Sequence, residues 1–191
     1  MTSRAEQLFP KEPVTESRTL TDAATSLSFL GAVVDEERID SRTMIEEGKR
    51  GVILKVAEDR NIGYREVLED FRNLSGMLRR FEHVGQTLQS TSASSKIIID
   101  HDLSTSIMIT TQLGFRAAFE AERNRGKIDE QKLISDYAAP FTGGVEELVS
   151  IIANVRGSLD ILVNVPIFEV EAEEALQGEE RRQQYVDNMN T

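Results

Sequence analysis

The chain of 191 residues is long enough for one domain with its own core, and its 33 acidic and 22 basic residues give a formal net charge of −11. Nucleic acids and anionic membranes attract basic surfaces, so we do not expect a nucleic acid as the main partner of this acidic chain. The chain has no cysteine, which excludes disulfides, cysteine-based zinc sites and thiol nucleophiles and predicts a cytoplasmic protein.

Residues 1–19 predict an extended, flexible N-terminal arm. Pro10 and Pro13 stand among charged and hydroxyl residues, a composition that cannot bury a core. The segment also lacks the apolar centre of a signal peptide. The longest apolar runs, such as residues 161–165, are far too short to cross a membrane, so no membrane partner is expected.

Residues 20–165 predict a single helical domain. No proline occurs from Val14 to Ala139, a run of 126 residues, whereas a chain of strands and turns would need more turn residues. The first helix is expected to begin at Thr21 and Asp22, whose side chains can cap it. Thr43 and Glu46 have the spacing of a capping box and predict the start of a second helix. The predicted fold is therefore all-α, an irregular helical bundle.

A seven-residue apolar repeat marks one long helix over residues 64–88. Its members are Val67, Phe71, Leu74, Leu78, Phe81, Gly85 and Leu88. This spacing places all of them along one side of a helix, as in coiled coils and long bundle helices. Two interpretations remain open: the face packs inside its own domain, or it joins two copies in a homo-oligomer.

Three further helices are predicted before Pro166. The helix over residues 103–123 is expected to turn five side chains inward: Ile107, Leu113, Phe115, Ala118 and Phe119. Asp129 is a predicted N-cap, because Ile128 and Leu133 flank it at the spacing of a hydrophobic staple. Residues 145–163 keep a continuous apolar face and predict a well-buried helix.

Residues 166–191 predict an acidic C-terminal helix or tail. Six acidic residues and no basic residue occur from Glu169 to Glu180, and Arg181 and Arg182 follow. Acids first and bases last suit the helix macrodipole. The acidic stretch is either a solvated helix face or a docking surface for a basic protein partner.

The search for catalytic chemistry assigns no catalytic, cofactor-binding or metal-binding residue, because no phosphate-binding loop, nucleophile elbow or HExxH motif is present. His83 and the pair His101-Asp102, with Asp129 or Asp136 as a final aspartate, resemble the His…His-Asp…Asp pattern of HD-domain phosphohydrolases. That resemblance implies an all-α enzyme in which imidazole and carboxylate ligands hold a divalent ion that activates water.

A second resemblance lies in the predicted helix over residues 103–123. Its residues are Thr110, Leu113, Ala117, Ala118, Glu120, Ala121 and Arg123. They are similar to the tip of the signalling hairpin in methyl-accepting chemoreceptors. This resemblance implies a helical signalling module that binds a histidine-kinase coupling complex.

Taken together, these patterns favour a non-enzymatic helical interaction or assembly protein, such as a structural, scaffold or adaptor subunit acting through self-association. No cofactor is expected. The metal-dependent phosphohydrolase is the leading alternative, and the chemoreceptor-like module is the third.

Overall fold

The structure is a computed structural model that describes residues 16–46, 49–89 and 99–190. Within these ranges the chain forms eight α-helices and no strand, which confirms the predicted all-α fold. The helices are α1 (Glu16–Glu37), α2 (Ser41–Glu46), α3 (Lys49–Arg60), α4 (Tyr64–Gln89), α5 (Leu103–Arg123), α6 (Glu130–Ala138), α7 (Gly144–Val163) and α8 (Ile167–Met189).

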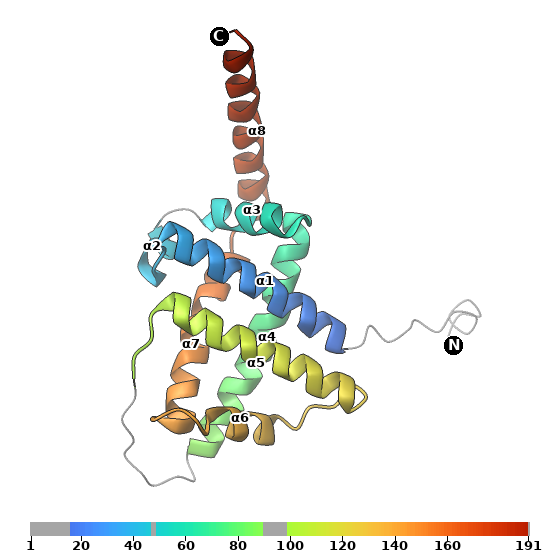
Figure 1. Cartoon of the computed structure of the whole chain (residues 1–191), viewed down its shortest axis with the longest axis vertical. Helices are drawn as coiled ribbons and strands as arrows, with labels where there is room; N and C mark the ends of the chain where they lie inside the picture. Colours follow the sequence, from blue (N-terminus) through green and yellow to red (C-terminus); the bar gives the residue numbers. More distant parts are fainter. Residues whose placement is uncertain (1–15, 47–48, 90–98, 191) are drawn as a thin grey trace, which may run out of the picture.

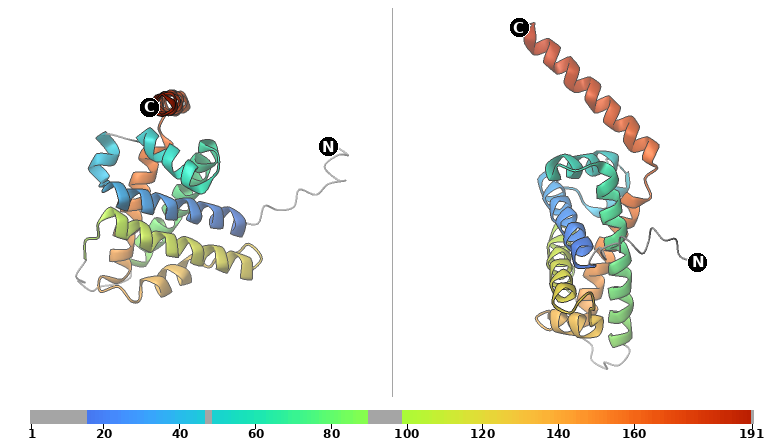
Figure 2. Two further views of the ribbon diagram at one scale, coloured as in Figure 1. Left: turned by 45° about the horizontal axis from the view of Figure 1, so that its top comes forward. Right: turned by 90° about the vertical axis from the view of Figure 1, so that its right-hand side faces the viewer.

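The bundle has two main layers. In one, α1 and α5 lie side by side and run in opposite directions (Figure 1), and in the other α4 packs against α7. The two layers meet where α1 packs on α4 and α5 packs on α7. Helices α3 and α6 lie at opposite ends of this body, and α8 leaves it (Figure 2). The core therefore lies between the α1–α5 and α4–α7 pairs.

Small residues bring α1 and α5 close together. A Cβ atom at Gly31 would lie 2.9 Å from Ile107 Cγ2, and one at Gly114 would lie 3.1 Å from the Cβ of Ala24. Both distances are shorter than comfortable van der Waals contacts. The absence of side chains at these two glycines thus sets the distance between the helices.

The apolar repeat of α4 lies inside the body. Val67, Phe71, Leu74, Leu78 and Phe81 are each 0% exposed and belong to the central core. Of the two interpretations that the sequence left open, the internal one therefore holds. These side chains are already covered by the rest of the chain, so this face is not available to a second copy.

Two polar junctions tie the helices together. Arg60 of α3 pairs with Asp70 of α4 and donates to Ser26 Oγ of α1 at 2.7 Å, while Ser26 Oγ donates to Asp70 Oδ2 at 2.6 Å. Arg156 of α7 donates to Glu82 Oε2 of α4 at 2.6 Å. Both ion pairs are mostly shielded from solvent, so each carboxylate is matched by a guanidinium where water solvates it only in part.

The helix boundaries differ from prediction at two places near the N-terminus. Helix α1 begins at Glu16, so residues 16–19 of the predicted arm are helical, and residues 1–15 lie outside the described residues. Thr21 lies within the helix and donates to the carbonyl of Ser17. Asp40 caps α2 in place of Thr43, because Asp40 Oδ1 accepts from the Thr43 N–H at 2.7 Å.

Two of the five inward residues predicted for α5 are wrong. Phe115 and Phe119 are 40% and 58% exposed, whereas Ile107, Leu113 and Ala118 are buried as expected. The two phenylalanines share the solvent side of α5 because they are four positions apart.

Helix α6 begins where the sequence predicts. Asp129 is its N-cap and accepts a hydrogen bond from the Lys132 N–H at 3.0 Å. Leu133 is buried and Ile128 packs against the core, as a hydrophobic staple requires.

The chain turns sharply between α7 and α8, whose axes differ by 77°. Asn164 is the C-cap of α7, and Pro166 is the N-cap of α8. In the described part of the chain, no single helix is long and apolar enough to span a membrane; only α7 and α8 together, as a bent pair, have that length and composition.

Candidate functional site

Helix α8 is fixed to the body by its first turns. Val170 is fully buried, and Ile167 packs against the core. Tyr64 Oη and Arg65 Nη2, at the start of α4, both donate to Glu171 Oε1 at 2.9 and 2.8 Å. These two hydrogen bonds hold the pKa of Glu171 below its usual value. The base of the helix therefore has a defined direction relative to the bundle.

One side of α8 faces α3. Arg181 Nη2 lies 3.4 Å from Glu58 Oε2, and Arg50 Nε lies 3.6 Å from Glu169 Oε2. Between the two helices is a groove of about 480 Å³, lined on the α8 side by Glu174, Gln177, Gly178 and Arg181. This side of α8 therefore contacts α3 of the same chain.

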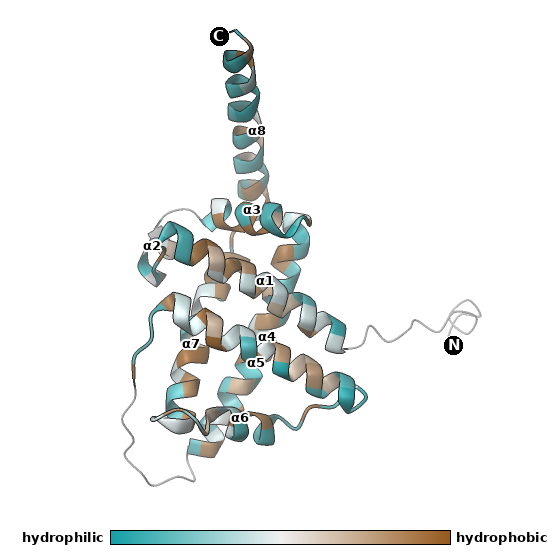
Figure 3. Ribbon diagram, viewed as in Figure 1, coloured by the Kyte–Doolittle hydropathy of each residue, from teal (hydrophilic) through white to brown (hydrophobic). Residues whose placement is uncertain are grey.

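Helix α8 also exposes large apolar side chains to solvent. Of nine such side chains exposed in the described part of the chain, five are on α8, and we call them the outer face: Phe168, Leu176, Tyr185, Val186 and Met189. At 100° per residue they occupy one half of the helix, and Val170 occupies the other. In Figure 3 the ribbon of α8 is mostly hydrophilic, with a few apolar positions along it.

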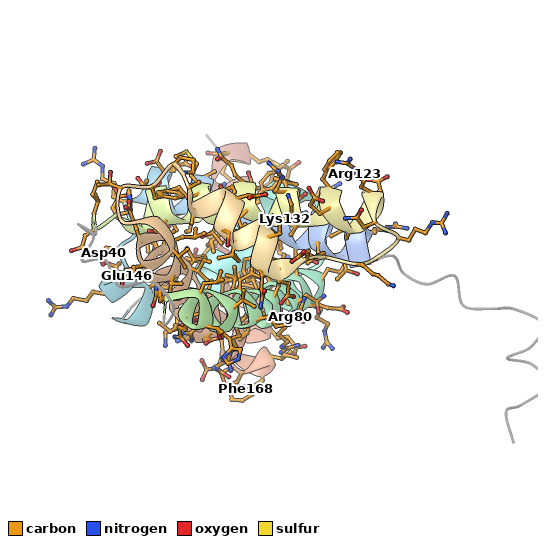
Figure 4. The ribbon with its side chains drawn as sticks, turned by 90° about the horizontal axis from the view of Figure 1, so that it is seen from below. Asp40, Arg80, Arg123, Lys132, Glu146 and Phe168 are labelled. Atoms are coloured by element: carbon orange, nitrogen blue, oxygen red, sulfur yellow. The ribbon has the colours of Figure 1, made fainter. Side chains whose placement is uncertain are left out.

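The exposure of the outer face is large. Phe168 and Met189 are each 70% exposed, and Figure 4 shows Phe168 extending away from the body. A monomeric soluble chain does not need such side chains on a projecting helix, because its core lies elsewhere. Grouped exposed apolar residues typically mark an interaction surface.

A second exposed apolar group lies beside α1. Met108 and Phe115 of α5 line a groove of about 450 Å³ whose other wall is formed by Ser28, Ala32 and Asp35 of α1. Phe119 continues the same side of α5. This groove is shallow and half polar, and the outer face of α8 carries more exposed apolar residues.

Two of the candidate metal residues, His101 and Asp102, serve structural roles. His101 Nε2 donates to Glu147 Oε1 at 2.8 Å, and Asp102 Oδ1 accepts from the Thr105 N–H at 2.7 Å as the N-cap of α5. His83 is exposed on α4. Among the described residues, no group of three or more His, Asp and Glu side chains could hold a metal ion.

Glu147 is the residue of this region that sequence reasoning missed. It is 2% exposed, in the first turn of α7, and its Oε2 accepts from the Gly143 N–H at 2.7 Å. Burial favours the neutral carboxyl, but the hydrogen bonds from His101 and Gly143 outweigh it, so the pKa of Glu147 is lowered. Glu147 thus clamps the start of α5 to the start of α7.

The remaining candidate residues also have structural roles. Asp129 caps α6, and Asp136 Oδ2 accepts from Lys132 Nζ at 2.9 Å. Of the residues similar to the chemoreceptor tip, five are buried: Thr110, Leu113, Ala117, Ala118 and Ala121. After Arg123 the chain turns into the nine-residue helix α6.

In comparisons with known proteins, no family model, no curated protein and no solved structure matches this chain.

Proposed function

We propose that this chain is a non-enzymatic helical assembly protein that associates with itself through α8. The observation that carries this proposal is the outer face of α8, five large apolar side chains on a helix that leaves the body. Burying a side chain of this kind contributes about 1.5–3 kcal/mol, so covering the outer face supplies a driving force for association.

The position of α8 supports this choice over the other helices. The apolar repeat of α4 is buried in the core. Met108 and Phe115 on α5 border α1 in a groove, whereas the last turns of α8, which carry Val186 and Met189, extend beyond α3 (Figure 2). A second chain can approach the outer face of α8 without displacing anything.

The structural roles of His101 and Asp102 support an assembly protein over a phosphohydrolase. One side chain holds Glu147 and the other caps α5. Metal analysis of the purified chain tests this preference, since stoichiometric metal that is lost in the His101→Ala variant would favour the enzyme.

A basic protein that docks on the acidic stretch of α8 is less favoured than a second copy of the chain. Glu169 and Glu171 already pair with Arg50 and Arg65 of the same chain. These contacts reduce the negative charge that the first turn of α8 offers to another protein.

The test compares the mass in solution of the wild type with two variants on the same turn of α8. Val186→Glu places a charge on the outer face, and Asn188→Glu places the same charge on the opposite side. We expect the wild type and Asn188→Glu to exceed the monomer mass of 21.4 kDa and Val186→Glu to match it, with equal helicity in all three. A wild type that stays monomeric at high concentration contradicts the proposal.

A further inference from the structure

We infer that α8 pairs with α8 of a second copy in antiparallel orientation, in the register that places Ala172 of one copy opposite Met189 of the other. This inference rests on the proposed self-association and specifies its geometry. It follows from the order of small, large, acidic and basic residues on one side of the helix.

Six exposed residues of α8 repeat at alternating spacings of three and four. They are Ala172, Ala175, Glu179, Arg182, Val186 and Met189. This spacing is that of the contact positions of a two-helix coiled coil. The strip lies within the half of α8 that carries the outer face, and Val186 and Met189 belong to both.

The antiparallel register matches every member of this strip to a complementary residue. The facing pairs are Ala172 with Met189, Ala175 with Val186 and Glu179 with Arg182. Each alanine meets a longer apolar side chain, and each acid meets a base. Two-fold symmetry repeats the three pairs, which gives six layers over a length of about 26 Å at 1.5 Å per residue.

The competing arrangements lack this complementarity. A parallel pair in register sets Glu179 against Glu179 and Arg182 against Arg182, which places like charges in contact. An antiparallel pair shifted by one heptad sets Arg182 against Ala172 and Glu179 against Ala175, which leaves both charges without a facing partner. The charges of Glu179 and Arg182 therefore select one register.

The distribution of charge along α8 supports the same orientation. The acids from Glu169 to Glu180 occupy its first half, and Arg181 and Arg182 follow. In an antiparallel pair the basic turn of one helix lies beside the acidic half of the other. The two bundles would then lie at opposite ends of the helix pair, because each α8 is anchored at its start by Val170.

Single cysteines test the orientation, since the chain has none of its own. Ala175→Cys and Val186→Cys are prepared in the full chain and incubated in a glutathione redox buffer, separately and mixed. We expect a disulfide-linked dimer only in the mixture, because identical cysteines are separated by about 16 Å along an antiparallel pair. Asn188→Cys, mixed with either variant, is the matched control and should not cross-link.

Charge exchange tests the register. Glu179→Arg alone and Arg182→Glu alone should each weaken the dimer at least tenfold, and the chain carrying both changes should regain wild-type association, because the facing pair is then restored with its charges exchanged. A double variant that stays as weak as the single ones overturns the register.

The remaining outcomes separate this inference from the function on which it rests. Disulfides formed by each cysteine variant alone indicate a parallel pair, which overturns the inference and leaves self-association intact. If the wild type dimerises but no cysteine variant or mixture of variants cross-links, the inference is overturned and the interface lies elsewhere. A wild type that remains monomeric overturns both.

Discussion

Replacing Gly85 with alanine tests how closely α4 and α7 pack. Gly85 belongs to the apolar repeat of α4, and a Cβ atom built on it would lie 2.3 Å from Val149 Cγ2 of α7. Gly76 is on the same helix, but a Cβ atom there would meet nothing within 4 Å. The two glycines therefore form a matched pair, one at the helix contact and one exposed to solvent.

The free energy of unfolding is expected to rise when Gly76 is replaced with alanine and to fall when Gly85 is. Alanine in place of glycine in a helix interior stabilises by about 0.8–1 kcal/mol, and Gly76→Ala should show this gain in full. At Gly85 the same gain is opposed by overpacking, which costs about 1–3 kcal/mol. Val149 cannot easily turn aside, because valine in a helix strongly prefers one rotamer. Gly85→Ala should therefore lower the stability by up to about 2 kcal/mol.

Urea denaturation followed by circular dichroism measures both variants, alone and in a Val149→Ala background. Removing Val149 Cγ2 should remove the clash, so Gly85→Ala should then stabilise the chain about as much as Gly76→Ala does. Equal stabilisation by the two variants in the wild-type background would refute the close contact between α4 and α7.

Three further predictions concern the core and its buried charges. Leu78→Asp should abolish the helical circular dichroism signal, because it leaves a carboxylate unpaired in the core; a folded monomer would contradict the internal position. Asp70→Ala should lower the free energy of unfolding by up to about 3–5 kcal/mol in denaturant titrations, because the largely buried Arg60 loses its main partner and keeps only the longer ion pair with Asp22. The lowered pKa of Glu147 stabilises the fold above the ordinary carboxyl pKa, and this contribution is lost as the pH falls through the folded-state value. Glu147→Gln should therefore flatten the acid side of the stability–pH curve, and an unchanged curve would exclude this carboxylate as its source.

The long helices were predictable because apolar periodicity sets them locally. The repeat from Val67 to Phe81 predicts α4 whether its partner is internal or another chain, so it could not decide between the two. The error at Phe115 has a geometric cause: it lies two positions from buried Leu113, about 200° around the helix, so the two cannot share a face. Counting angles instead of apolar residues would have placed Phe115 outside.

The contacts that join distant segments were not predictable. Glu147 and His101 are 46 positions apart, and they meet only because the starts of α5 and α7 lie together. The sequence signal for Glu147 was limited to an acidic residue in the first turn of a helix, which many solvated helices share. The two faces of α8 likewise depend on where α3 lies, which no spacing within residues 166–191 encodes.

The pairing of α1 with α5 has a consequence for how the chain folds during synthesis. Arg123, at the end of α5, is 86 positions after Glu37, the last residue of α1. At a synthesis rate of about 5–20 residues per second, α1 waits roughly 4–17 s for its main neighbour. Throughout that interval the apolar side of α1, with Leu27 and Leu30, is without its final cover. The ribosome-bound chain therefore passes through a stage at which a chaperone can bind α1, and this stage ends only when α5 has emerged.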